Sequence, residues 1–195
     1  MSGVVDRERV ARAVRELLSA IGENPDSAEL ASTPVRVADA YAEFFSGVGV
    51  DAVALLADAV PVGSDTGELV LVRDISLRSV CEHHLLPFAG RAHIAYLPGE
   101  QVVGLGALPK VVDVLAARPQ VQERLGEQIA DTIAASLDAR GVLVVLSAHH
   151  ECVTMRGGRQ PDAATVTIAA RGALAEPAAR AEILMLLTAS AESGG

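Results

Sequence analysis

The organisation of this chain is decided by the segment Ser79-Val80-Cys81-Glu82-His83-His84-Leu85, which is matched far along the sequence by a second segment, His149-His150-Glu151-Cys152. The chain has two cysteines and five histidines, and these segments contain both cysteines and every histidine except His93. Cys81 and His84 form a Cys-x-x-His pair, a spacing at which one tight turn can present both side chains to the same ion. This concentration of thiols and imidazoles predicts a metal site.

A third ligand is expected from Cys152, which can complete the set from a distant strand. Two thiolates and one imidazole form a donor set that suits zinc. Three protein ligands leave the fourth tetrahedral position to water, which is typical of a catalytic zinc site and not of a structural one. A lone Cys-x-x-His pair would be weak support, because buried cysteine is common as a small hydrophobic residue. The second segment favours the metal over that alternative.

The composition narrows the classes of partner. The formal net charge of -9 opposes binding to a phosphate backbone, and aromatic residues make up only 3% of the chain, with no Trp to stack on bases. No stretch approaches the roughly 18 apolar residues of a membrane span, and the charged N-terminus has no signal-peptide core. We therefore expect a cytoplasmic protein with no nucleic acid and no membrane partner. In that reducing compartment the cysteines stay available to a metal, although oxidised, metal-free protein could form a disulfide.

The first part of the chain has helical periodicity. Apolar residues recur at spacings of three and four across 6–21, which predicts an amphipathic helix. Thr33-Pro34 has the pattern of an N-cap followed by proline at the first helical position, and it predicts a second helix that runs to Gly47. A short third helix is expected over 51–59.

A polar, glycine-containing linker at 62–67 marks the expected boundary between an N-terminal helical segment, 1–62, and a catalytic domain, 63–195. Beyond it, runs rich in Val, Ile and Leu have the length of strands and alternate with helical patterns. Strands are expected at 68–80, 90–97, 141–148 and 164–172, and helices at 105–116, 121–137 and 176–189. The predicted fold class is α+β, with antiparallel strands on either side of the first Cys-His segment.

Three separated motifs resemble the signature segments of the GTP cyclohydrolase I family. They are Cys81-Glu82-His83-His84, the run Arg118-Pro119-Gln120-Val121-Gln122-Glu123-Arg124-Leu125, and His150-x-Cys152 followed by Met155-Arg156-Gly157. The similarity keeps its register from about Val14 to Leu187. It implies a tunnelling fold, in which an antiparallel sheet carries helices on one face beside an N-terminal helical pair. It also implies a ring-shaped homo-oligomer, a decamer in this family, with active sites at subunit interfaces.

The resemblance implies an activity as well. Enzymes of this family convert GTP into 7,8-dihydroneopterin triphosphate and formate. By position, Cys81, His84 and Cys152 match the zinc ligands, and His83 and His150 match histidines that transfer protons. Because thiolates donate more charge than imidazoles, they make zinc a weaker Lewis acid, so proton-transfer groups beside the metal must share the work.

The same resemblance implies how substrate is held. Glu123 matches the carboxylate that recognises the guanine edge, and Gln122 lies beside it in the expected pocket. Adenine could not make this pairing, because it lacks the N1-H and 2-amino donors. Arg156 matches a triphosphate-binding arginine, and Lys110 and Arg36 are further cations expected to reach phosphate.

The chain departs from the family pattern on the ribose and phosphate side. The family usually has Gly-Leu-Ser-Lys followed by an arginine, whereas here Gly104-Leu105-Gly106-Ala107 precedes Lys110. A segment expected to be rich in Ser and Thr reads Ala163-Ala164-Thr165-Val166-Thr167-Ile168-Ala169. Two alternatives therefore stay open. One is a homologue that acts on a less phosphorylated or modified guanine nucleotide, and the other is a ring protein that binds a purine or pterin without turnover.

Some of these residues also have ordinary structural explanations. His93 alternates with apolar residues on an expected strand, so we expect it to be structural. His149 lies outside the matched positions and is expected to support the fold or its neighbours. A helical Glu123 is ordinarily part of a solvated charged face, and 156–159 is also the pattern of a plain hairpin turn.

Overall fold

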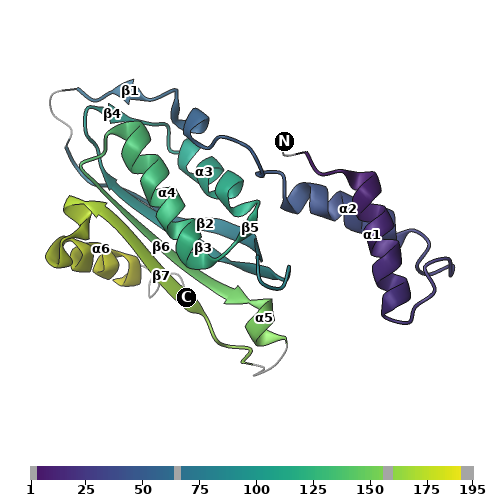
Figure 1. Cartoon of the computed structure of the whole chain (residues 1–195). Coiled ribbons are helices and arrows are strands. Elements are labelled where there is room, and N and C mark those ends of the chain that lie inside the picture. The colour runs from purple at the N-terminus through teal and green to yellow at the C-terminus, as the bar shows by residue number, and fades with distance from the viewer. Residues whose placement is uncertain (1–3, 64–66, 156–159, 190–195) are drawn as a thin grey trace. The chain divides into compact units, whose positions relative to one another are not determined.

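The computed structural model describes residues 4–63, 67–155 and 160–189 (Figure 1). The chain forms two compact units, Met1–Val50 and Asp51–Gly195. Their boundary lies ahead of the linker expected at 62–67, because Ala52 and Leu56 are buried in the hydrophobic core of the second unit. Among the described residues, none of the helices has both the length and the apolar character needed to cross a membrane.

The first unit contains the expected pair of helices, α1 (Arg7–Ala20) and α2 (Thr33–Phe44). The carboxylate of Asp6 caps α1 by accepting a hydrogen bond from the backbone N–H of Arg9 at 2.9 Å. The N-cap of α2 is Ser32 and not Thr33, so the expected start was wrong by one residue. The two helices pack together and bury Leu18 and Ala38.

The second unit is built on a sheet with the strand order β5-β2-β3-β6-β7. The strands are β2 (Val70–Cys81), β3 (Pro87–Leu97), β5 (Pro119–Gln120), β6 (Gly141–His150) and β7 (Thr165–Gly172). The long neighbouring strands are antiparallel, as predicted, and only the short β5 runs parallel to β2. The unit is therefore α+β with a sheet that is mainly antiparallel.

The predicted positions of the long helices are confirmed. The helices are α3 (Ala107–Ala116), α4 (Gln122–Leu137) and α6 (Pro177–Ala189). Several short elements were not predicted, because two to four residues carry no periodic signal. These are β1 (Val60–Pro61) paired with β4 (Gln101–Val102), β5, α5 (Glu151–Thr154) and the 3-10 turn η2 (Ala173–Ala175). The expected helix at 51–59 is the single 3-10 turn η1 (Val53–Leu56).

The expectation that helices lie on one face holds only for α3 and α4, which pack on β2 and on β6 with β7 (Figure 1). The other face of the sheet carries a second cluster, in which Ile183 of α6 joins Ala95, Leu143 and Val145. Every residue from Gly141 to Leu146 is buried. A strand with apolar residues on both faces needs cover on both sides, which α6 supplies on the second face.

The close pairing of β3 with β6 leaves no room for a side chain at Gly90. A Cβ atom at Gly90 would lie 1.9 Å from the carbonyl oxygen of Ser147 and 2.6 Å from the Cα of Ala148, both backbone atoms of the neighbouring strand. Such atoms cannot move without breaking the ladder. We expect Gly90→Ala to lower the free energy of unfolding by about 2–4 kcal/mol, measured by urea denaturation at fixed protein concentration.

Gly126 of α4 is the matched control. A Cβ there would lie 3.6 Å from the side chains of Ala169 and Leu146, an ordinary contact distance. Alanine is also the better helix former by about 1 kcal/mol. Gly126→Ala should therefore leave stability unchanged or raise it, and equal destabilisation by the two variants would contradict the register assigned to β3 and β6.

Candidate metal centre and active site

The first Cys-His segment forms a tight turn between β2 and β3. The backbone N–H of Cys81 donates to the carbonyl of Leu86 at 2.8 Å, and that of Leu85 donates to Cys81 at 2.9 Å. Leu85 takes a positive φ of 53°, which lets the chain reverse within this short span. The turn leaves Cys81 buried and His84 exposed, three residues apart on one side of the loop.

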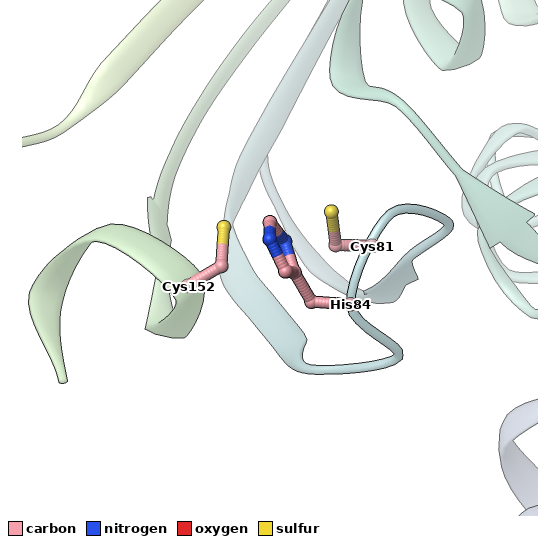
Figure 2. Close-up of side chains that lie close together, drawn as sticks. All are labelled: Cys81, His84 and Cys152. Carbon is pink, nitrogen blue, oxygen red and sulfur yellow. The ribbon is translucent and has the colours of Figure 1, made fainter. Parts of the chain in front are cut away.

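The second segment arrives at the same end of the sheet because β6 pairs with β3. Phe88 near the start of β3 lies opposite His150 at the end of β6. Cys152 follows in the short helix α5, so the prediction that it would come from a strand was wrong: the strand ends at His150. The Cys152 side chain extends from this helix and lies beside His84. Figure 2 shows it together with His84 and Cys81.

Cys81, His84 and Cys152 form the predicted group. Each offers one ligand atom, and these three atoms all lie within 4.8 Å of one another. The cysteines are not joined in a disulfide. Ligands on one tetrahedral zinc ion would be about 3.5–3.8 Å apart, so a contraction of about 1 Å, within the reach of side-chain rotation, would accommodate the ion. The donor set and its spacing therefore fit zinc with a position left for water.

Contacts to β5 and to the start of α4 hold the turn that carries Cys81 and His84 in place. The backbone N–H of Glu82 donates to the carbonyl of Gln120 at 3.0 Å, and the Glu82 carboxylate forms an ion pair with Arg124. The Arg124 guanidinium also donates to the Gln120 side chain at 3.3 Å. The hydrogen bond from Arg124 is the main reason that the pKa of Glu82 lies below its usual value. Arg124 thus links the turn to the helix that also carries Gln122 and Glu123.

We expect Arg124→Met to weaken zinc binding by about 10- to 100-fold, because the turn that carries Cys81 and His84 loses a side-chain anchor. Competition with a chelator of known zinc affinity measures this directly.

Arg171→Met is the matched control for that measurement. Arg171 pairs with Glu127 and Asp131 of α4, but it lies opposite Val142, at the other end of β6 from His150. It should leave zinc affinity unchanged. If Arg124→Met binds zinc as tightly as the unaltered protein, the anchoring role is wrong.

His150 is held by two contacts beside the metal group. Its ring stacks on Phe88, with ring centres 4.5 Å apart and planes within 10°. Its Nε2 lies 2.8 Å from Oε1 of Gln122. Burial lowers the pKa of His150, and the nearby negative charge of Glu123 partly offsets this effect. Burial therefore disfavours the charged form of the ring, and Glu123 is close enough to influence it electrostatically.

The other predicted site residues in this unit differ in how far their side chains are exposed. His83 is largely exposed, with its Nε2 3.8 Å from a carboxylate oxygen of Glu82. Glu123 is exposed in the first turn of α4. Gln122 is only 2% exposed, and its amide makes hydrogen bonds to neighbours within the chain.

The predicted phosphate-binding cations lie on separate parts of the chain. Lys110 is exposed on α3 and has no ion pair within the part of the chain that the structure describes. Arg36 is exposed on α2 of the first unit. Arg156 lies outside the described residues, as does Arg159.

The structure also shows the surroundings of the two histidines that were expected to support the fold, His93 and His149. The Nδ1 of His93 accepts a hydrogen bond from the backbone N–H of Asp74 at 3.1 Å, which confirms a structural contact. Asp74 has a positive φ of 59° at a shift in the β2–β3 register, so His93 stabilises this irregularity. His149 is exposed on β6, opposite Ala89.

Sequence reasoning missed three side chains that shape the site: Arg124, Phe88 and Thr167. Arg124 lies within the motif at 118–125, and its spacing of four residues from Gln120 could have predicted a contact between the two side chains. Phe88 and Thr167 gave none, because their contacts depend on strand register.

Fold and site together define a class: an α+β enzyme with a Cys-His-Cys group suited to a catalytic metal and with histidines beside it suited to proton transfer. A family model described as GTP cyclohydrolase I matches residues 10–188. The chain belongs to the GTP cyclohydrolase I family, and it is an enzyme of this type.

Curated relatives agree with that assignment. The chain is 64% identical over 182 residues to GTP cyclohydrolase 1 of Leifsonia xyli subsp. xyli, covering 93% of this chain and 95% of that protein. It is 52% identical to GTP cyclohydrolase 1 of Rhodopirellula baltica, covering 96% and 81%, and 49% identical to that of Streptomyces griseus, covering 96% and 93%. Among solved structures, an archaeosine synthase QueF-like protein in the apo form aligns over 53% of this chain and 93% of its own, with 19% identity and a TM-score of 0.43.

Proposed function

We propose that this enzyme is zinc-dependent, opens the imidazole ring of GTP, and rearranges the product to 7,8-dihydroneopterin triphosphate with release of formate. The observation that carries the proposal is the convergence of Cys81, His84 and Cys152, whose ligand atoms lie within 4.8 Å of one another. When bound, zinc with three protein ligands acts as a Lewis acid that makes a water molecule nucleophilic near neutral pH.

His83 and His150 are the proposed proton-transfer groups. Opening the ring requires water to add at C8 of guanine while N7 gains a proton, and imidazole can both donate and accept near pH 7. A second addition of water releases formate, after which the ribose rearranges and closes the new ring. His83 is accessible to substrate because most of its side chain is exposed, whereas His150 is held against Phe88 and Gln122.

Glu123 is the proposed guanine-recognition residue. A carboxylate can accept one hydrogen bond from guanine N1-H and another from the 2-amino group. Support comes from its exposed position at the start of α4 and from its electrostatic effect on His150. We further propose that Arg156, Lys110 and Arg36 bind the triphosphate, since the chain as a whole is acidic and needs local cations for an anionic substrate.

We also propose a tunnelling fold that assembles into a ring-shaped homo-oligomer, a cytoplasmic decamer with active sites at subunit interfaces. Strand β7 supports assembly because it ends the order β5-β2-β3-β6-β7 and exposes apolar side chains at Val166 (60%) and Ile168 (42%). An edge strand with such side chains is a natural site for pairing with a second copy.

The test is incubation of the purified zinc-loaded protein with GTP. We expect equal amounts of formate and of a pterin that becomes fluorescent after oxidation. Absence of both products, from protein that contains zinc, would contradict the proposal. Unchanged GTP that remains bound would instead favour a binding protein without turnover.

A second candidate keeps the reaction and changes the substrate to a less phosphorylated or modified guanine nucleotide. It is favoured by Gly106 and Ala107, which place no hydroxyl or cation at the start of α3, and by Lys110 in place of an arginine. Turnover of GTP, GDP, GMP and guanosine under the same conditions distinguishes the two, because a strong preference for GTP excludes the second.

A further inference from the structure

Gln122 is buried at the start of α4, beneath β6 and β7, and is only 2% exposed. Its Nε2 carries two hydrogens and lies within hydrogen-bond distance of three acceptors, the carbonyl oxygens of Leu146 at 3.1 Å and Thr165 at 2.9 Å and the hydroxyl of Thr167 at 3.1 Å, so one hydrogen is shared. Its Oε1 lies 2.8 Å from Nε2 of His150. All the polar atoms of this amide are therefore used within the chain.

These partners determine which way the amide faces. Backbone carbonyl oxygens only accept hydrogen bonds, so the atom of Gln122 that faces Leu146 and Thr165 must be the NH2 group. A flipped amide would bring its oxygen against two carbonyl oxygens and lose both bonds. The Gln122 oxygen is thus directed at His150 by contacts that do not involve His150.

An amide oxygen can only accept, so Nε2 of His150 must carry the hydrogen. In the neutral imidazole the other nitrogen, Nδ1, then holds the lone pair. Among the described residues, Nδ1 makes no hydrogen bond. Stacking on Phe88, at 4.5 Å between ring centres, also restricts rotation of the ring.

We propose that Gln122 is a positioning residue that selects the Nε2-H tautomer of His150, so that His150 exchanges protons with substrate through Nδ1. Gln122 would then act without touching substrate, in contrast to its expected place in the guanine pocket. The inference rests on the proposed role of His150 in proton transfer. A buried amide that engages Nε2 leaves Nδ1 as the nitrogen available for proton exchange.

The kinetic test compares Gln122→Met, His150→Ala and the double variant in the zinc-loaded enzyme. We expect Gln122→Met to lower kcat by about 10- to 1,000-fold while KM for GTP and zinc content stay within about twofold. The double variant should be no slower than His150→Ala, because the two residues act as one unit.

Several results would overturn the inference. If Gln122→Met mainly raises KM, or if its effect multiplies with that of His150→Ala, Gln122 contacts substrate independently of His150. Normal kcat in Gln122→Met also refutes the inference. If His150→Ala is fully active, the proposed proton-transfer role of His150 is wrong. That result can be told apart from a failure of the tautomer inference, in which His150→Ala is inactive and Gln122→Met is normal.

Gln128→Met is the matched control, since Gln128 lies on the same helix and accepts a hydrogen bond from Gln120, away from His150. It should leave kcat unchanged.

A spectroscopic readout needs no variant of Gln122 and remains decisive if that variant does not fold. In zinc-loaded enzyme with 15N-labelled histidine, solid-state NMR at a pH where His150 is neutral should give a protonated Nε2 signal and an unprotonated Nδ1 signal. Comparison with His150→Ala assigns the pair. The reverse pattern would refute the inference.

Discussion

His84→Ala is expected to reduce GTP turnover by at least about 10³-fold and to remove most of the bound zinc. The loss of one of three ligands opens the site, and a lost Lewis acid is worth several kcal/mol of transition-state stabilisation. Zinc content by atomic spectroscopy and formate release from GTP measure the two effects on the same sample. The effect should be this large because Cys81 and Cys152 are the only other members of the group within the described residues.

His149→Ala provides the matched comparison. His149 is also an exposed histidine in a ligand-bearing segment, but it lies outside the Cys-His-Cys group. We expect it to keep its zinc and nearly all its activity. Full activity in His84→Ala, or equal losses in the two variants, would rule out the assignment of His84 as a metal ligand.

Glu123→Gln is expected to lower kcat/KM for GTP by about 10²- to 10⁴-fold. The variant loses a charge and at least one of two charge-assisted hydrogen bonds, each worth about 1.5–3 kcal/mol. Inosine triphosphate sharpens the measurement because it lacks the 2-amino group. The unaltered enzyme should discriminate strongly between GTP and inosine triphosphate, and Glu123→Gln should lose most of that discrimination.

The control is Glu127→Gln, one helical turn further along α4. Glu127 pairs with Arg171 of β7, so its loss affects a surface ion pair and not guanine. It should keep GTP turnover within about threefold. If Glu123→Gln retains its preference for GTP over inosine triphosphate, another residue recognises guanine.

Much of the architecture followed from local pattern. Apolar spacing located α1, α3 and α4 to within a few residues, and runs of Val, Ile and Leu located the long strands. The short elements were missed because so few residues cannot show a period. The placement of α6 was missed for another reason: residues 142–146 are apolar on both faces of β6, but alternation does not say which helix covers each face.

The candidate site divides in the same way. Cys81, His84 and Cys152 could be grouped beforehand, because thiols and imidazoles are scarce here and their concentration in two segments carries information. Gln122 was expected beside the substrate, and its burial depends on how α4 packs against β6 and β7. The stacking of His150 on Phe88 depends on a cross-strand register that the spacing of residues does not state.

The sequence by itself determined the fold class and the candidate site residues. The chain is α+β, with a Cys-His-Cys donor set, two histidines in the family motifs and an acidic residue at the start of a helix. These follow from side-chain chemistry and local periodicity, which are properties of neighbours along the chain. Only the tertiary structure decided which atoms face one another. The pairing of β3 with β6 and the packing of α4 bring together residues far apart in sequence, and they orient the amide of Gln122 toward the ring of His150.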